Sequence, residues 1–492
     1  RSTLFPYTTL FRSPAGPGAP ARAPGRAARS PGRIMRAVPA LLSPLPRRAL
    51  ARWLARAGRL GARLVSSRPV MALGVLCLAL PVASWTVGDG AFAVMFDSSV
   101  YYGAIAHWRA GGDLYDWYAQ PLLHQYPFTY PPFAAWALAP LTRLGERGLQ
   151  LVLTALTPVG AALTAGACLR RLGAGRRLAL GLAPWAALAA SELLEPFRET
   201  LYEGQVNAVL MTLVALDVLA VPESSRLRGV LSAVAASFKL TPAIALAVFL
   251  IRREWRAAAT MAATAAGITA ACWLADPKSS RRFFASAMLD PSRTGFAEYA
   301  GNQNLRGTIA RLLPEPWWTP LWAVCAALVL AGGWLVCRRL ERLRATAGLA
   351  RRDQGVILAL ELGAVMVTGL LVSPVSWSHH WVWALEVLLA LGAAARAWRS
   401  GALAAITAAG AVVIGVGIHW SFPFQSHAEF AWPLWQKLAG SGYTWWALLA
   451  GAVLARAARR RRIAAAATSA GAVGDSQGSR ARDAVLRKVR AR

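Results

Sequence analysis

Acidic residues and cysteines are scarce in this chain of 492 residues. Asp and Glu together number 23, against 54 Lys and Arg, and the five cysteines form no Cys-x-x-Cys pair. Neither a disulfide framework nor a zinc site is indicated by this usage. The sequence also lacks a glycine-rich phosphate-binding loop and a paired-metal signature. The segments between its apolar runs are too short to form a soluble nucleotide-binding domain.

Apolar residues, in contrast, are abundant. The chain is 56% hydrophobic with a mean hydropathy of +0.40, and many uncharged runs approach the roughly 20 residues that cross a bilayer as a helix. A net charge of +31 would suggest nucleic-acid binding in a soluble protein. Here the arginines cluster between apolar runs, as in loops that follow the positive-inside rule. The sequence therefore predicts an all-α polytopic protein of the lipid bilayer, with no nucleic-acid partner.

The arginine clusters also divide the chain. Residues 1–34 begin with a stretch that resembles translated adapter sequence, and we expect a non-native or disordered leader there. Residues 35–69 contain arginines and no acid and should be a cytoplasmic basic arm, residues 70–455 the membrane domain, and residues 456–492 a basic disordered tail. About ten full spans are predicted, at residues 70–87, 149–169, 178–194, 206–221, 257–275, 317–337, 356–372, 381–395, 402–418 and 445–455.

Residues 229–251 conflict with a simple crossing because basic clusters flank both ends. Lys239 is costly at mid-membrane depth, and Pro242 breaks a helix. We therefore predict a re-entrant pair of half-helices that dips into the membrane and returns. With this pair, all six histidines of the chain fall on the outer side of the membrane or at its interface.

The loop that follows the first span, residues 96–133, is too polar for hydrocarbon. It contains Asp97, Tyr101 and Tyr130, and an acidic residue directly beyond a span is suited to act as a general base at the interface. An ordinary solvated loop with interfacial aromatics would show the same composition.

Three other segments carry polar side chains at the predicted outer mouth. Carboxylates and amides bind sugar hydroxyls, and basic groups bind phosphate, so these segments suit a phosphosugar pocket. Each also has an ordinary interpretation, as a polar hairpin tip, an amide-rich loop or an aromatic belt. The residues are Arg198, Glu199, Gln205 and Asn207; Asn302, Asn304 and Arg306; and His379 and His380.

Taken together, these motifs resemble glycosyltransferase family 87, whose members are polyprenol-phosphate-mannose-dependent mannosyltransferases of the GT-C membrane fold. The resemblance covers residues 70–455 in order. It rests on FDSSVYY, GGDLY, YPFTYPPF, YEGQVN, RGVLSAVAASFKLTPA, NQNLRG and SPVSWSHHWVW.

The resemblance implies a multi-pass enzyme of the bacterial plasma membrane whose active site faces the extracytoplasmic side. Its donor would be polyprenyl-phosphate-mannose, and its acceptor a glycolipid or glycan. Asp97 matches the family's catalytic base, and His379 or His380 its late-loop histidine. Many GT-C families carry two adjacent acids where this chain has Asp97 followed by Ser98 and Ser99. That departure favours a single base, without a metal or other cofactor.

The predicted mechanism is a direct displacement with inversion, in which Asp97 removes the acceptor proton. Candidate donor-phosphate ligands are Arg198, Lys239 and Arg306, with one of the two histidines. Candidate sugar or acceptor contacts are Tyr101, Tyr130, Glu199, Gln205, Asn207, Asn302 and Asn304.

The alternative is a flippase or transporter of lipid-linked saccharides, which would show paired ionisable residues or repeated broken helices along a central pathway. A third interpretation, a non-catalytic membrane scaffold, would not need convergent acids and amides in its outer loops.

Overall fold

The computed structural model describes residues 47–86, 95–119, 126–346 and 349–477. The chain divides into two compact units, residues 1–60 and 61–492. The predicted leader at residues 1–34 lies outside the described residues, as does the tail beyond Gln477. The described part of the first unit is the beginning of helix α1 (Arg47–Val65).

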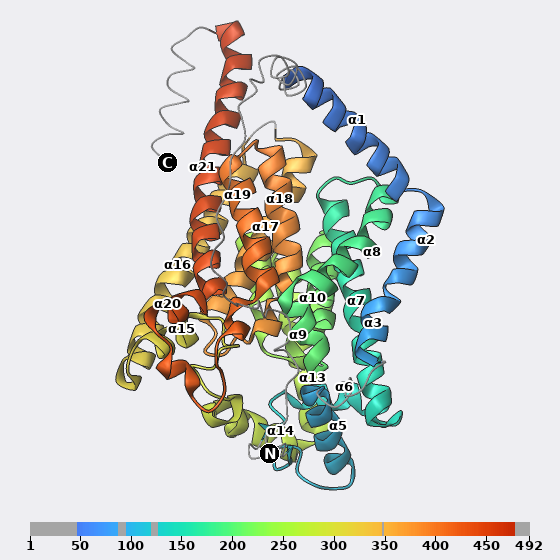
Figure 1. Ribbon diagram of the computed structural model, residues 1–492, viewed down its shortest axis with the longest axis vertical. Coiled ribbons are helices and arrows are strands. Elements are labelled where there is room, and N and C mark those ends of the chain that lie inside the picture. Colours follow the sequence, from blue (N-terminus) through green and yellow to red (C-terminus); the bar gives the residue numbers. More distant parts are fainter. Residues whose placement is uncertain (1–46, 87–94, 120–125, 347–348, 478–492) are drawn as a thin grey trace, which may run out of the picture. The chain divides into compact units, whose positions relative to one another are not determined.

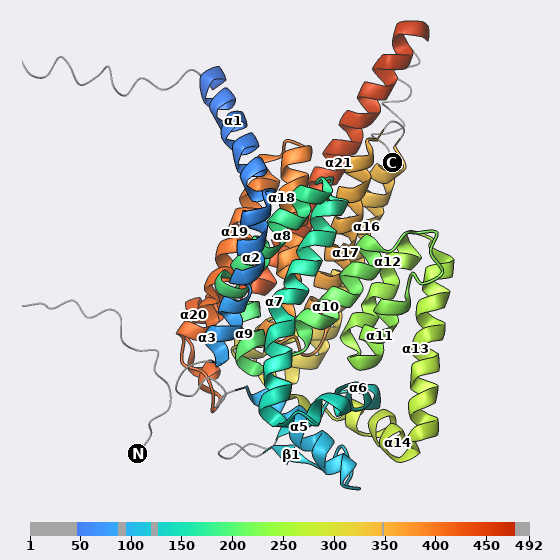
Figure 2. The same cartoon turned by 90° about the vertical axis from the view of Figure 1, so that its right-hand side faces the viewer.

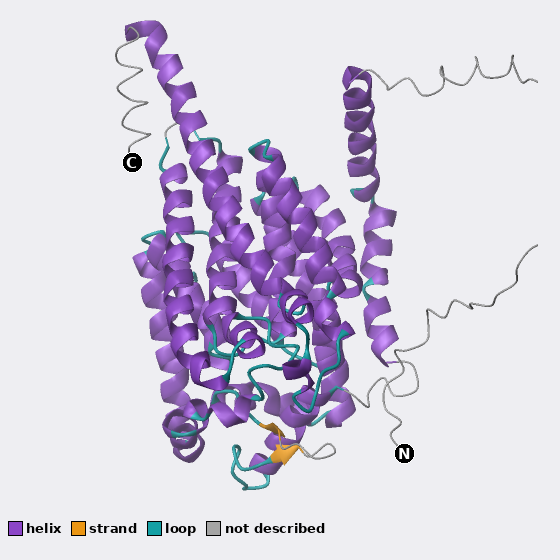
Figure 3. Ribbon diagram, turned by 60° about the vertical axis from the view of Figure 1, so that its left-hand side comes forward, coloured by secondary structure: helices purple, strands orange, loops and turns teal. Residues whose placement is uncertain are grey.

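Nearly every described segment of the second unit is helical (Figure 3). Its α-helices are α2 (Arg68–Cys77), α3 (Ala79–Thr86), α5 (Phe96–Arg109), α6 (Pro132–Thr142), α7 (Gly145–Arg171), α8 (Arg176–Leu193), α9 (Glu195–Glu203), α10 (Asn207–Ala215), α11 (Val230–Phe238), α12 (Leu246–Ile251), α13 (Trp255–Ala275), α14 (Pro277–Ala285), α15 (Leu305–Leu312), α16 (Trp318–Arg344), α17 (Arg351–Val372), α18 (Ala384–Ala397), α19 (Gly401–Val416), α20 (Leu434–Ala439) and α21 (Gly442–Gln477).

Short irregular helices join these elements. The π-helix η1 (Leu216–Ala220) continues α10, and the 3₁₀ helices are η2 (Thr241–Ala245), η3 (Ala287–Leu289), η4 (Pro291–Thr294), η5 (Glu315–Trp317), η6 (Ser378–Trp383), η7 (Ile418–Ser421) and η8 (Ala428–Ala431). Strands β1 (Tyr118–Ala119) and β2 (Tyr126–Pro127) pair antiparallel, with Tyr118 opposite Pro127.

Six helical segments in the described part of the chain are long and apolar enough to cross a membrane. They are Arg68–Trp85, Gly145–Arg171, Trp255–Ala275, Glu315–Arg344, Arg351–Val372 and Gly401–Ser421. A seventh is obtained if α8 and α9, which meet at a bend of 77°, form one broken span. On their outer surfaces these helices expose large apolar side chains such as Leu274 on α13 and Leu328 on α16, as expected for contact with lipid. The fold is thus that of an all-α polytopic membrane protein.

The predicted count of about ten spans is not confirmed. The segments predicted at 206–221 and 381–395 form α10 with η1, and α18, which reach only 14 residues each. Helices of this length are too short to cross the hydrocarbon core of a bilayer by themselves. The C-terminal tail also differs from the prediction. It was expected to be disordered from residue 456, but α21 continues to Gln477. Its alanine-rich sequence has high helix propensity.

The predicted break at residues 239–242 is observed. Helix α11 ends at Phe238, Lys239 adopts an extended backbone, and η2 and α12 follow. Arg228, which precedes α11, pairs with Glu254, which follows α12, through an Nε–Oε2 distance of 2.6 Å. Because both ends of the segment are joined, the chain enters and leaves this hairpin on the same side, as the re-entrant prediction requires.

Ionic contacts hold the base of this hairpin. Arg252 lies 2.8 Å from Glu361 of α17, and the buried Asp217 carboxylate accepts hydrogen bonds from the backbone amides of Gly229 and Ser232 at the start of α11. A carboxylate at a helix N-terminus satisfies free amides and complements the helix dipole. Two of the acids inside predicted spans are therefore structural anchors rather than steps of a transport pathway.

The two ends of the second unit differ in character. Helices α5, α6 and α14 gather at one end, and the C-terminal half of α21 lies at the opposite end (Figures 1 and 2). At the α21 end, Arg461 pairs with Asp353 at the start of α17, close to Arg352 and the α7–α8 turn. At the α5 end, the Trp108 indole donates to Asp276 at 2.8 Å and so ties α5 to the segment between α13 and α14.

Candidate active site

Asp97 lies in the first turn of α5 and is half-buried. The hydroxyls of the next two residues, Ser98 and Ser99, donate to the Met95 carbonyl. Helix α9 ends against this turn at Gly204, whose φ is +66° and whose added Cβ would lie 2.5 Å from the Ser98 hydroxyl. A glycine is needed here both for the left-handed backbone and for the close approach. The contact places Gln205, the next residue, beside Asp97.

A buried hydrogen-bond network surrounds the Asp97 carboxylate. Gln205 Nε2 donates to Asp97 Oδ2 at 2.6 Å. The Tyr101 and Tyr130 hydroxyls lie 2.9 and 3.2 Å from Gln205 Oε1, and 2.8 Å from each other. Three side chains, from α5, the turn that follows α9 and the loop before α6, are thus fixed around one carboxylate.

The re-entrant break supplies a cation to the same network. Lys239 Nζ donates to Asn207 Oδ1 at 3.0 Å and to the Tyr130 hydroxyl at 3.4 Å, and it lies 3.0 Å from His380 Nε2. It also lies 5.1 Å from the centroid of the Tyr130 ring, a cation–π distance. Tyr130 therefore connects the carboxylate side of the site with its cationic side.

The two histidines have different surroundings. His380 presents its Nε2 to Lys239, and its buried Nδ1 has no partner in the described part of the chain. The Thr200 hydroxyl and the Asn207 amide donate hydrogen bonds of 3.3 and 3.2 Å to the backbone carbonyl of His379, not to its imidazole. Of the two imidazoles, only that of His380 thus joins the network around Lys239.

The electrostatics of the site suit a base beside a phosphate. Burial raises the pKa of Asp97 to about 6, although the Gln205 hydrogen bond and the Lys239 charge act to lower it. Burial and the charge of Lys239 hold the pKa values of His379 and His380 well below the usual histidine range. At neutral pH Asp97 is therefore mostly ionised, whereas both imidazoles are neutral.

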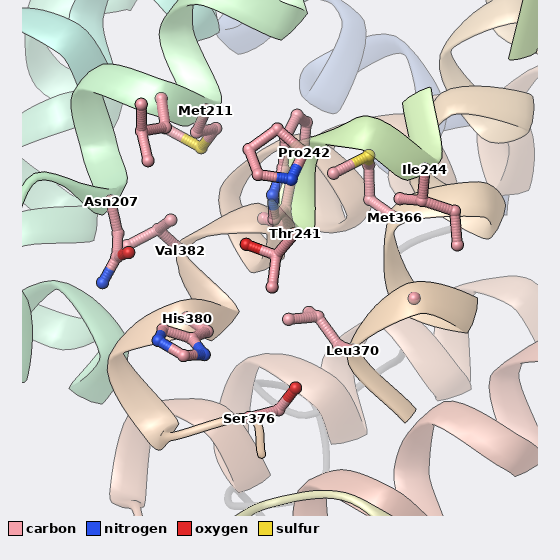
Figure 4. A pocket seen from close by; sticks show the side chains of 13 residues that line it. Asn207, Met211, Thr241, Pro242, Ile244, Met366, Leu370, Ser376, His380 and Val382 are labelled. Carbon is pink, nitrogen blue, oxygen red and sulfur yellow. The ribbon is translucent and has the colours of Figure 1, made fainter. Parts of the chain in front are cut away.

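A narrow cavity of about 40 Å³ opens beside His380 and Asn207. Figure 4 shows the polar side chains of Asn207 and His380 on one side of the cavity, and Met366, Ile244 and Leu370 on the other. A volume of this size holds a few water molecules but no sugar ring. We call this narrow cavity between α10, η2 and α17 the seam. Its lining is polar near Lys239 and apolar farther from Lys239.

Other predicted residues make contacts of a different kind. The Arg198 guanidinium donates to the backbone carbonyls of Glu192 and Gly415, at 3.2 and 2.9 Å. Asn302 accepts from the Ser376 amide, and Asn304 both caps α15 and donates to the Ser373 carbonyl. These amides hold the loop between α17 and η6, and the structure does not bring them into the Asp97 network.

Arg306 is half-buried in the first turn of α15, and its Nε has no partner in the described part of the chain. Glu199 is half-buried on α9, one helical turn before Glu203. The sequence placed Glu203 in the same polar loop but assigned it no specific role, although its spacing of four from Glu199 puts both on one helix face. It likewise assigned no specific role to Tyr126, which packs on Phe96 with a ring-centroid distance of 4.4 Å. Burial and the charges of Glu203 and Asp97 raise the pKa of Tyr126, so its ring lies near both carboxylates.

Comparison with known proteins identifies the family of this chain. The sequence profile of glycosyltransferase family 87 matches residues 128–374. The chain belongs to glycosyltransferase family 87. The family 87 match contains Tyr130, Gln205, Asn207 and Lys239, whereas Asp97 precedes it and the two histidines follow it.

Curated relatives within family 87 extend the match. A polyprenol-phosphate-mannose-dependent α-(1-2)-phosphatidylinositol mannoside mannosyltransferase of Mycolicibacterium smegmatis is 36% identical over 70% of this chain and 76% of its own length. The protein of the same name from Mycobacterium tuberculosis is 33% identical over 79% of this chain and 90% of its own. A polyprenol-phosphate-mannose-dependent α-(1-2)-phosphatidylinositol pentamannoside mannosyltransferase of M. smegmatis is 35% identical over 67% of this chain and 76% of its own length. No solved structure matches the chain.

Proposed function

We propose that this family 87 protein transfers mannose from polyprenyl-phosphate-mannose to a glycolipid of the phosphatidylinositol mannoside class. The family and the names of its relatives support this enzyme class and donor. The relatives act on phosphatidylinositol mannosides, and this chain covers most of their length, which supports the same class of acceptor.

One observation carries the proposal. A carboxylate and an ammonium group are fixed on two sides of one tyrosine: Gln205 joins the Tyr130 hydroxyl to Asp97, and Lys239 bonds the same hydroxyl. Sugar transfer from a lipid phosphate needs this pair, a base for the acceptor hydroxyl and a positive charge for the departing phosphate.

The reaction follows as one displacement. Asp97 takes the proton of the acceptor hydroxyl as that oxygen attacks the anomeric carbon of mannose. The bond from the anomeric carbon to the phosphate oxygen breaks, and polyprenyl phosphate leaves with the electron pair. Attack opposite the leaving group inverts the anomeric configuration. Lys239 stabilises the negative charge that develops on the phosphate, and Asn207 and His380 hold Lys239 in place.

The narrow seam provides a place for the donor lipid. Leu210, Met211, Ile244, Met366 and Leu370 line it beyond His380. With the donor phosphate beside Lys239, the first isoprene units would extend along these apolar side chains once the seam widens. Arg306 is a further candidate for the phosphate because its Nε is unpartnered in the described structure.

The charge distribution supports an extracytoplasmic active site in a bacterial plasma membrane. Arginines gather at the end of the bundle where Arg461 meets Asp353, and the Asp97 network lies toward α5 at the other end. The positive-inside rule assigns the arginine-rich end to the cytoplasm.

The proposal is tested with the purified chain in detergent, labelled polyprenyl-phosphate-mannose and a phosphatidylinositol mannoside extract. We expect a labelled glycolipid whose new anomeric bond, determined by NMR, has the configuration opposite to that of the donor. Retention of configuration would refute direct displacement, and an active chain that labels no phosphatidylinositol mannoside would refute the acceptor class.

A further inference from the structure

Two carboxylates near Asp97 have no role in the chemistry above. Glu199 and Glu203 lie one turn apart on α9, and positions i and i+4 of a helix share a face. Both are half-buried, and neither has a hydrogen-bond or ion-pair partner among the residues that the structure describes. Carboxylates in such positions normally find protein donors, so these two are open to a ligand that brings its own hydroxyl groups.

Nearby tyrosines show how the carboxylates are ordered. The pKa of Tyr126 is raised by burial and by the charges of Glu203 and Asp97. The pKa of Tyr299 is raised by burial and then by Glu203 and Glu199. Glu203 is thus near both tyrosines, Asp97 near the first and Glu199 near the second. The three carboxylates are therefore arranged in the order Asp97, Glu203 and Glu199, at increasing distance from the reacting centre.

The aromatic rings add an apolar component. Tyr126 is 40% exposed and packs against Phe96, next to Asp97. Tyr299 belongs to a second group, with ring centroids 5.7 Å from Trp377 and 5.8 Å from Trp420. Aromatic rings present an apolar surface to the C–H faces of sugars, while carboxylates accept hydrogen bonds from sugar hydroxyls.

We infer that Glu203 and Glu199, with Tyr126 and Tyr299, form an acceptor strip that binds the neutral glycan of the acceptor over at least two sugar units. The inference rests on the proposed transferase function and adds to it the part of the acceptor that is recognised. The terminal sugar lies between Tyr126 and Glu203 with its hydroxyl at Asp97, and the preceding sugar lies at Glu199 and Tyr299. Positions i and i+4 are separated by about 6 Å along a helix, close to the length of one hexose unit.

The groups on the two sides of Asp97 also sort the substrates. Lys239 lies on the donor side, where a phosphate must bind. The strip offers no cation to a lipid phosphate, whereas its carboxyl groups and aromatic rings can bind an uncharged glycan. The acceptor is therefore recognised through its sugars, with its own phosphate held away from the strip.

The test is a direct binding measurement on the full chain in detergent, made without the donor. Tryptophan fluorescence or saturation-transfer NMR would follow titrations with methyl α-mannoside and with α-1,2-linked mannotriose. The variants are Glu203→Gln and Glu199→Gln, with Glu192→Gln as the matched control, since Glu192 is exposed at the end of α8.

We expect mannotriose to bind the wild type more tightly than methyl α-mannoside does. Each strip variant should weaken mannotriose binding by roughly tenfold, the effect of losing one hydrogen bond to a carboxyl group. Methyl α-mannoside should respond to Glu203→Gln alone, and Glu192→Gln should change neither ligand. Circular dichroism and the thermal midpoint would verify that each variant is folded.

Equal binding of mannotriose by wild type and strip variants, or no preference for mannotriose over methyl α-mannoside, would overturn the inference. The proposed function fails separately: if mannotriose binds as expected but no mannose is transferred from polyprenyl-phosphate-mannose, the strip stands and the donor assignment does not. If transfer occurs and glycan binding is unaffected by the variants, the strip alone is refuted.

Discussion

Gln205 Nε2 donates a hydrogen bond of 2.6 Å to Asp97 Oδ2 across 108 residues of sequence. The same amide accepts from two tyrosine hydroxyls through its oxygen, so its orientation is fixed by the network. The carboxylate that we propose as the base is therefore positioned by the turn that follows α9 as well as by its own helix.

The first prediction concerns the pH dependence of transfer. Asp97 acts as a base only when ionised, so kcat/KM should fall as the pH drops through about 6, the pKa of this carboxyl. The Gln205 hydrogen bond lowers that pKa, and Gln205→Leu removes it. The acidic limb of the pH–rate profile should therefore move to higher pH in Gln205→Leu. An unchanged limb would show that the titrating group is not Asp97.

Lys239 should control the donor rather than the acceptor. Lys239→Met removes the positive charge near the leaving phosphate, and we expect kcat/KM for the donor to fall by about 10²–10³, the usual loss for one charge-stabilising group. Lys278→Met is the matched control because Lys278 is exposed and pairs with Asp113. Steady-state kinetics with each substrate varied in turn will separate the effects. A variant that mainly raises the acceptor KM would contradict this role.

Substitution of the two adjacent histidines should reduce the transfer rate to different extents. His380→Phe removes the imidazole nitrogen that lies 3.0 Å from Lys239, and transfer should drop by at least tenfold. In His379→Phe the backbone carbonyl that Asn207 and Thr200 bond is retained, so the loss should be smaller. Initial rates at matched amounts of folded protein will compare them. The reverse order of effects would identify His379 as the histidine that serves the donor.

The re-entrant hairpin should depend on its buried ion pair. Arg252→Met leaves the fully buried Glu361 without its partner, and breaking such a pair costs about 3–5 kcal/mol. The thermal midpoint in detergent should fall sharply, and the double variant Arg252→Met/Glu361→Met should recover part of the loss. If the single variant unfolds like the wild type, the pair does not stabilise the hairpin.

Part of this organisation could be predicted from sequence because its causes are local. Pro242 and Lys239 within an apolar run predict a broken helix, and the structure breaks at Lys239. Asp97 was chosen as the candidate base for its place just after a span. Both signals depend on residue type and depth in the membrane, which the sequence shows directly.

Other features depend on tertiary contacts that no local pattern reveals. Asn302 and Asn304 resemble sugar ligands in sequence, yet their amides bond the loop that precedes η6. Glu203 received no specific role from sequence because only the packing of Gly204 against Ser98 brings the end of α9 to Asp97. The span count is not confirmed because apolar helices such as α18 are shorter than the length that crosses a bilayer by itself.

The central claim is that Asp97 is the base, and Asp97→Asn tests it most directly. Asparagine keeps the size of the side chain and removes its capacity to accept a proton, whereas Asp116→Asn, at an exposed residue paired with Arg282, serves as the control. With labelled polyprenyl-phosphate-mannose and phosphatidylinositol mannoside acceptor, we expect Asp97→Asn to lose at least 10²-fold in kcat and Asp116→Asn to match the wild type. Transfer by a folded Asp97→Asn variant at the wild-type rate would contradict the account.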